Sequence, residues 1–181
     1  PGSEIDISRH NPVQLSNDGF GGGTIPANVQ GSMTIGGAGT GQAIILDGGR
    51  INITQIPGLP VNPFGGLGVA VGGNALGSTQ GGTGRLSVGR AGSELNILGD
   101  SGALVIGTGN GNAGGSGTVS VYDGGKITVA GGVSTFEFTA IGSLPNTAGT
   151  LSIYGAGSTV IGGDSVGIAT NATLTDADPT N

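Results

Sequence analysis

The sequence predicts an all-β fold: a right-handed single-stranded parallel β-helix, or β-solenoid, with three short strands per coil and about four to five coils. Two observations lead to this fold class. Glycine is far more frequent than in ordinary globular proteins, at 43 of 181 residues, and short runs rich in Val, Ile and Leu recur between the glycines. In addition, a Gly-x-apolar-x-apolar segment returns along the chain, and such self-similarity is the signature of a repeat protein.

The first strand of each coil carries this glycine anchor. Alternation of apolar residues with Ser or Thr predicts a strand with one buried face. Coils therefore start near residues 41, 84, 117 and 149. The anchors are Gly41–Ile45 (a degenerate copy), Gly84–Val88, Gly117–Val121 and Gly149–Ile153.

A small turn and two further strands follow each anchor. The turns are Asp47–Gly49, Arg90–Gly92, Asp123–Gly125 and Gly155–Gly157. The second runs are 51–53, 95–97, 127–129 and 160–161, and the third runs are 69–71, 104–106, 136–141 and 166–169. Met33–Ile35 is the third run of a partial coil. Equivalent strands of successive coils are expected to pair in parallel and to stack their inward residues into one apolar column.

The repeats divide the chain into four parts. Residues 1–3 (Pro-Gly-Ser) resemble a cloning scar, and 4–30 form an irregular N-terminal segment or a partial coil. Residues 31–170 hold the solenoid repeats, and 171–181 are a terminal tail or the start of the next coil.

Composition excludes several classes of protein. The formal net charge of −6, with five scattered Lys and Arg residues, argues against a nucleic-acid partner. No apolar run is long enough for a membrane-spanning helix, and the absence of cysteine excludes disulfides and zinc–thiolate sites. Frequent glycine and the lack of any apolar stripe of period 3.6 argue against helices.

The repeats resemble a known family. Gly82–Ile97, Gly115–Val129 and Ala148–Ile161 are similar to the glycine-rich repeat of type V secretion (autotransporter) passengers and of PEP-CTERM-associated surface proteins, which reads approximately G-x-G-T-L-x-V-x-x-G-G/S-x-L. The resemblance spans roughly residues 31–170. It implies a passenger on the surface of a Gram-negative bacterium, often an adhesin.

The resulting expectation is a rigid adhesive stalk rather than an enzyme, with no cofactor. Its partner is then a component of the host cell or extracellular matrix, or another bacterial cell. The chain is expected to be monomeric, with end-to-end association open to it. The alternatives are a pure structural spacer of a surface protein and a β-helix enzyme that acts on polysaccharides.

The Asp-Gly-Gly turns have two interpretations. Asp47 and Asp123 either belong to a binding face or calcium site, or form turns. Arg90 and Gly155 occupy the same slot in the other coils, which favours the turn. A second oxygen-rich cluster, Asp176, Asp178 and Asn181, lacks a distal Glu and is better explained as a polar tail. No metal site is therefore predicted, and the glycine-rich segments lack the Lys and helix of a phosphate loop.

Neither an active site nor an ice-binding ladder is predicted. The single histidine, His10, lies in the N-terminal stretch, and the acids Glu94, Asp100, Glu137 and Asp164 are interpreted as solvated polar positions. An ice-binding face needs a regular Thr-x-Thr ladder. The outward columns are mixed instead: one is Ser87, Ser120 and Ser152, and the other is Asn52, Asn96 and Thr128.

An insertion in the first coil, residues 54–68, is the best candidate for a partner contact. Loops on rigid scaffolds often carry recognition, and Leu59, Val61 and Phe64 are apolar candidates for it. The competing interpretation is that these side chains fold back over the wall of the solenoid and shield it.

Overall fold

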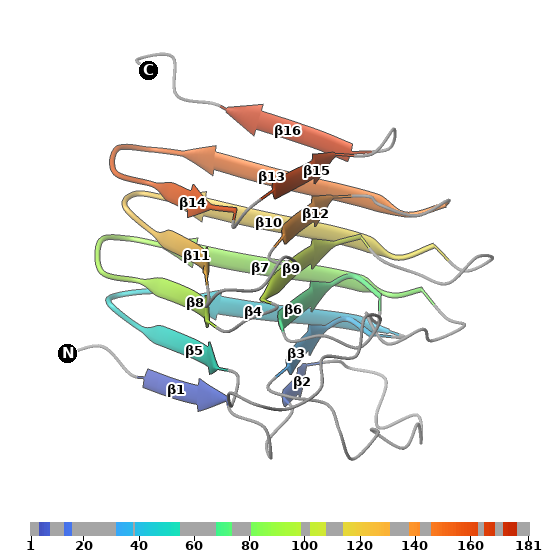
Figure 1. Ribbon diagram of the computed structural model, residues 1–181, viewed down its shortest axis with the longest axis horizontal. Helices are drawn as coiled ribbons and strands as arrows, with labels where there is room; N and C mark the ends of the chain where they lie inside the picture. The colour runs from blue at the N-terminus through green and yellow to red at the C-terminus, as the bar shows by residue number, and fades with distance from the viewer. Residues whose placement is uncertain are drawn as a thin grey trace.

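The computed structural model describes residues 4–7, 13–15, 32–37, 39–54, 68–73, 81–98, 102–107, 114–130, 138–141, 146–162, 165–168 and 172–176. Within these ranges the chain is all-β and contains no helix, and so no helix long and apolar enough to cross a membrane. The described strands form three parallel sheets, and the strands of each sheet lie one above another in Figure 1.

Sheet I contains the predicted anchor strands. Its strands are β4 (Thr40–Ile45), β7 (Thr83–Gly89), β10 (Ser116–Tyr122), β13 (Ala148–Tyr154) and β16 (Ala172–Asp176). Sheet II contains β1 (Glu4–Ile7), β5 (Arg50–Thr54), β8 (Glu94–Leu98), β11 (Lys126–Ala130) and β14 (Thr159–Ile161). Sheet III contains β2 (Val13–Leu15), β3 (Ser32–Ile35), β6 (Gly68–Val71), β9 (Ala103–Ile106), β12 (Phe138–Ile141) and β15 (Ser165–Ile168).

From β3 onward the chain visits the sheets in a constant order, III, I and II, so each strand pairs with its equivalent one round later. We call β4–β6 unit 1, β7–β9 unit 2, β10–β12 unit 3 and β13–β15 unit 4. The colours of Figure 1 follow the units from blue to red along one direction. Strands β1 and β2 lie within residues 4–30, for which the sequence allowed an irregular segment or a partial coil. Strand β16 lies within residues 171–181, for which the sequence allowed a tail or the start of a further coil.

The register confirms the alignment made from the sequence. In sheet I the anchor glycines Gly41, Gly84, Gly117 and Gly149 are successive Cα partners. In sheet II the successive partners are Ile51, Leu95, Ile127 and Val160. The apolar alternation therefore places equivalent side chains above one another.

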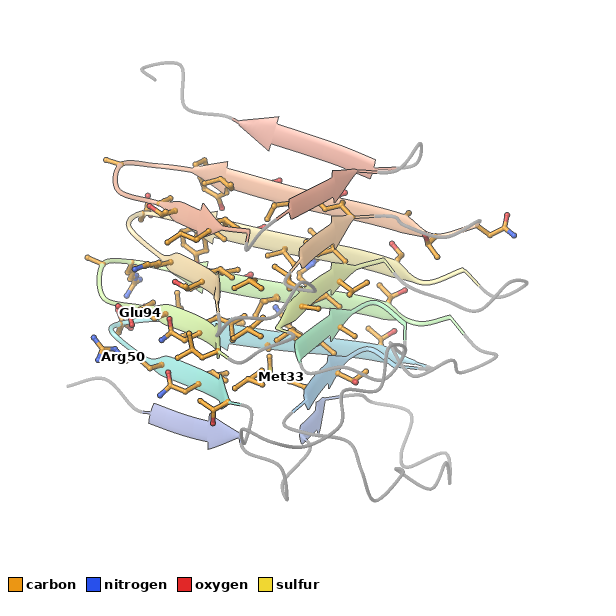
Figure 2. The ribbon with its side chains drawn as sticks, viewed as in Figure 1. Met33, Arg50 and Glu94 are labelled. Atoms are coloured by element: carbon orange, nitrogen blue, oxygen red, sulfur yellow. The ribbon has the colours of Figure 1, made fainter. Side chains whose placement is uncertain are left out.

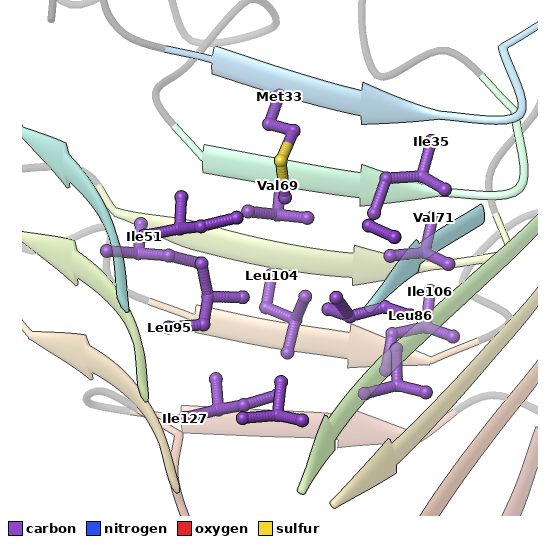
Figure 3. Packing of buried hydrophobic residues seen from close by; sticks show 14 of the residues in the cluster. Met33, Ile35, Ile51, Val69, Val71, Leu86, Leu95, Leu104, Ile106 and Ile127 are labelled. Atoms are coloured by element: carbon purple, nitrogen blue, oxygen red, sulfur yellow. The ribbon is translucent and has the colours of Figure 1, made fainter. Parts of the chain in front are cut away.

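The inward side chains of the three sheets form one apolar core. Figure 3 shows Ile51, Leu95 and Ile127 following one another along sheet II, while Met33 and Val69 lead to Leu104 along sheet III. Most of these side chains are fully buried; Leu86, Leu95 and Leu104, one from each sheet of unit 2, are 0% exposed. The core thus runs through the units between the sheets.

The anchor glycine is required by a close backbone approach. A Cβ atom on Gly117 would lie 2.1 Å from the carbonyl oxygen of Val71 and 2.5 Å from the backbone nitrogen of Gly107. On Gly84 it would lie 2.2 Å from the nitrogen of Gly72. Chain segments that leave sheet III pass directly over the start of β7 and of β10, so only glycine fits at these two positions.

Candidate functional site

The most distinctive polar feature of the described chain is the corner between sheets I and II. The first residue of each corner has a left-handed backbone, with φ of 55° at Asp47, 68° at Arg90, 49° at Asp123 and 79° at Gly155. Asp, Asn and Gly tolerate this conformation better than other residues. This backbone requirement accounts for aspartate at the corner without any ligand.

The corners of units 1 and 3 are Asp-Gly turns. In unit 1, Asp47 and Gly48 both have positive φ, and the Gly49 N–H donates to the carbonyl of Leu46 at 2.9 Å. In unit 3 the equivalent bond, from Gly125 to Tyr122, is 3.0 Å. Positive φ at both central residues is the property of a type I′ turn, for which Asp-Gly is a preferred sequence.

The corners of units 2 and 4 contain one residue more, a serine. In unit 2 the residues are Arg90, Ala91, Gly92 and Ser93, and the Ser93 N–H donates to the carbonyl of Arg90 at 3.2 Å. The same bond closes the corner of unit 4, from Ser158 to Gly155, at 3.2 Å. Here the central pair is Ala-Gly, and Gly92 and Gly157 have φ of 84° and 79°.

The corner carries two columns of charge. We define the corner surface as Asp47, Arg90 and Asp123 in the turn column and Arg50, Glu94 and Lys126 at the start of the sheet II strands. The charge alternates along each column, and the two columns are opposite in sign within each of units 1, 2 and 3. Glu4, at the register position next to Arg50, continues the alternation in sheet II.

Neighbouring members of the corner surface interact. The Arg90 guanidinium donates to the Asp47 carboxylate, and this contact, ahead of all other effects, raises the pKa of Arg90. Arg50 Nε lies 3.4 Å from Glu94 Oε2. Figure 2 labels both side chains at the start of the neighbouring strands β5 and β8. Glu94 also accepts a hydrogen bond from Asn96 Nδ2 at 3.3 Å, and Asn96 donates to Asn52 Oδ1 at 3.0 Å.

These contacts refine the interpretation of two predicted residues. The side chain of Glu94 is only 27% exposed and lies between Arg50 and Asn96, so it is not simply a solvated position. Asp47 is 68% exposed, and its carboxylate bonds to the next unit. Sequence reasoning did not identify Arg50, Arg90 or the corner serines as interacting residues; counting the residues between paired strands would have revealed the serines.

Two tyrosines border the corner on the side of sheet I. Tyr122 and Tyr154 are register partners, and their rings are stacked with centroids 5.5 Å apart and planes 8° from parallel. The equivalent residue of unit 2 is Gly89, and a Cβ atom there would lie 2.3 Å from Cζ of Tyr122. The Tyr122 ring therefore lies over the glycine backbone.

The remaining candidate residues are not brought into one site. Ser87, Ser120 and Ser152 do form one outward column, but its unit 1 member is Ile44, which is 55% exposed. The column of Asn52, Asn96 and Thr128 likewise ends at Ile161 in unit 4. Asp176 ends β16, and the described residues contain no group of three or more His, Asp or Glu placed to hold a metal ion.

Several candidates lie outside the described residues. They are His10, Leu59, Val61, Phe64, Asp100, Glu137, Asp164, Asp178 and Asn181, together with the Pro-Gly-Ser start.

No family model, curated protein or solved structure matches the chain.

Proposed function

We propose that the chain is a segment of a right-handed, single-stranded parallel β-helix that forms a rigid, adhesive stalk in a surface protein of a Gram-negative bacterium. The observation that carries this proposal is the constant order in which the chain visits three parallel sheets, with glycine anchors as successive register partners. The likeness of the repeats to autotransporter passengers and PEP-CTERM-associated proteins supports the surface location.

The packing supports a stiff element. Each unit contributes strands to all three sheets, so backbone ladders connect every pair of successive units on three sides of one core. Five strands at a spacing of about 4.8 Å give sheet I a height of about 20 Å. Bending such a stack would break ladder hydrogen bonds on one side, which suits it to carrying a load.

A pure spacer is the second candidate, and the corner surface favours it. Asp47 pairs with Arg90, and Arg50 pairs with Glu94, so these charged groups already have partners within the chain. In that case recognition resides in another region of the protein. The insertion with Leu59, Val61 and Phe64 is the proposed contact if this segment itself adheres.

Adhesion and shape are tested separately. Beads coated with the purified chain are expected to bind epithelial cells, or plates of collagen and fibronectin, above albumin-coated beads. A variant with Leu59→Ala and Phe64→Ala is expected to keep the circular dichroism spectrum and melting temperature of the parent and to lose this binding. Ser87→Ala, on the face of sheet I, is the matched control and is expected to bind like the parent.

The possible results separate the candidates. Absence of binding by a chain that keeps a β-rich circular dichroism spectrum and a cooperative melting transition would identify a spacer and overturn the adhesive role. If the double variant loses stability but binds normally, the insertion shields the wall and is not the contact. Small-angle scattering from an expanded coil would overturn the β-helix.

A further inference from the structure

The corners show that the structural repeat is a pair of units. The three-residue corner occurs in units 1 and 3, and the four-residue corner occurs in units 2 and 4. Because of the extra residue, the number of residues that separates register partners of adjacent units differs by one between sheet I and sheet II. Between units that are two apart this separation is the same in both sheets. Asp47 therefore corresponds to Asp123, and Arg50 corresponds to Lys126.

The serine of each longer corner bonds to the shorter corner before it. Ser93 is fully buried, and its hydroxyl accepts the N–H of Gly48 in unit 1 at 3.2 Å. Ser158 accepts the N–H of Gly124 in unit 3, also at 3.2 Å, and donates to the carbonyl of Tyr154 at 2.7 Å. The serines thus join unit 1 to unit 2 and unit 3 to unit 4.

The inward side chains of the sheet I strands by themselves do not distinguish one unit from the next. The inward positions of β4, β7 and β10 hold a glycine and two aliphatic residues each: Gly41, Ala43 and Ile45; Gly84, Leu86 and Val88; Gly117, Val119 and Val121. An apolar pattern of this kind permits unit 3 to stack directly on unit 1 during folding. Weakly specified parallel repeats are prone to such slips.

We propose that the alternating corner sets the stacking register by disfavouring strand pairing between units two apart. Placing unit 3 on unit 1 brings Asp123 against Asp47 and Lys126 against Arg50, so both charge columns become repulsive. The same slip leaves Gly48 without the Ser93 hydroxyl. In the native order the columns alternate in sign and the serine is in place. This device concerns folding and is independent of adhesion.

Two disulfide reporters distinguish the native and the slipped order in this cysteine-free chain. Gln42 and Arg85 are Cα partners, so Gln42→Cys with Arg85→Cys reports the native order. Gln42 and Thr118 are two strands apart in sheet I, about 9.6 Å, which exceeds the reach of a disulfide. Gln42→Cys with Thr118→Cys therefore reports unit 3 on unit 1.

The test is refolding from denaturant under oxidising conditions, with each disulfide quantified by mass spectrometry. The parent is expected to form the native disulfide and only background levels of the slipped one. Exchanging the charges of unit 3, Asp123→Arg with Lys126→Glu, makes unit 3 repel unit 2 and attract unit 1. We expect the slipped disulfide to rise about tenfold, the scale of two reversed charge contacts.

Inverting all six charges is the matched control. The changes are Asp47→Arg, Arg50→Glu, Arg90→Asp, Glu94→Arg, Asp123→Arg and Lys126→Glu. Glu4→Arg is added because Glu4 is the register partner of residue 50 and would otherwise repel the new glutamate, and the alternation is then restored with opposite signs. This variant is expected to form the native disulfide and to return the slipped one to background. A slipped disulfide that stays at background after the unit 3 exchange overturns the proposal. The proposal is also overturned if the charge-inverted variant forms the slipped disulfide as often as the exchange variant, or if it forms no native disulfide.

Discussion

At the scale of single residues, the first corner position selects for backbone conformation. Asp47, Arg90, Asp123 and Gly155 share a positive φ although their side chains differ in charge and size. Aspartate in Asp-Gly-Gly is therefore a turn former here, in agreement with the simpler interpretation of the sequence. The carboxylate of Asp47, in unit 1, also forms an ion pair with Arg90 of unit 2.

Two substitutions at Asp47 separate the backbone from the carboxylate. Asp47→Gly and Asp47→Ala both remove the ion pair with Arg90, but only alanine places a non-polar Cβ in a left-handed conformation. We expect Asp47→Ala to be less stable than Asp47→Gly by about 1 kcal/mol in urea unfolding, the cost of that conformation. Equal stabilities would mean that the turn relaxes and that φ does not select the residue.

At position 89, the side chain of the register partner Tyr122 leaves room only for glycine. The φ of Gly89 is not positive, and the Tyr122 ring covers the place where a Cβ would lie. We expect Gly89→Ala to cost about 1–2 kcal/mol in the parent, as overpacking does. In a Tyr122→Ala background the same change should cost little, so the double-mutant cycle should give a coupling energy of about 1 kcal/mol or more. Additive effects would show that the ring does not hold this position.

At the scale of elements, strand pairing follows from period-two alternation and the core follows from the pairing. Ile53 in β5 points inward and is 0% exposed, whereas Ile44 in β4 points outward and is 55% exposed. The two residues have the same type and belong to the same unit. They provide a direct comparison of the two faces of the wall.

Ile53→Ala is expected to lower the free energy of unfolding by about 2–4 kcal/mol, because it removes a fully buried side chain and leaves a cavity. Ile44→Ala is expected to change the free energy of unfolding by less than about 0.5 kcal/mol. Chemical denaturation of both variants measures the difference. A large loss from Ile44→Ala would instead indicate that this side chain is covered in solution, for example by a partner.

The elements also show what the sequence could and could not predict. The anchors aligned at Gly41, Gly84, Gly117 and Gly149 are register partners. At Gly84 and Gly117 a crossing backbone requires glycine, and such a requirement repeats the same residue at equivalent positions of the sequence. An alignment of the turns from their first residue does not reveal the serines at 93 and 158. A one-residue difference in turn length appears only when both flanking strands are paired.

Contacts on the outer surface were harder to predict. The pairing of Arg50 with Glu94 joins residues from different units, and it follows from the register rather than from any local motif. Glu94 was therefore interpreted as solvated. The insertion at residues 54–68 offers apolar side chains but no repeat to align, and Leu59, Val61 and Phe64 remain hypotheses from composition.

At the scale of the whole molecule, stability is expected to depend on how many neighbours each strand has. In a stack whose strands pair only with strands of adjacent units, strands paired on both sides open less often than strands at an edge. Unit 4 contains both kinds among the described strands. Strand β13 lies between β10 and β16 in sheet I, while β14 is at the edge of sheet II next to β11.

Hydrogen exchange of backbone amides under native conditions tests this dependence. Val160 in β14 and Ile127 in β11 are register partners, and we expect the Val160 amide to exchange at least about tenfold faster. Leu151 in β13 and Val119 in β10 are the matched pair in sheet I, where β16 covers unit 4, and their rates should differ less. If Val160 and Ile127 are equally protected, either β14 has a further partner in solution or the stack opens only as a whole.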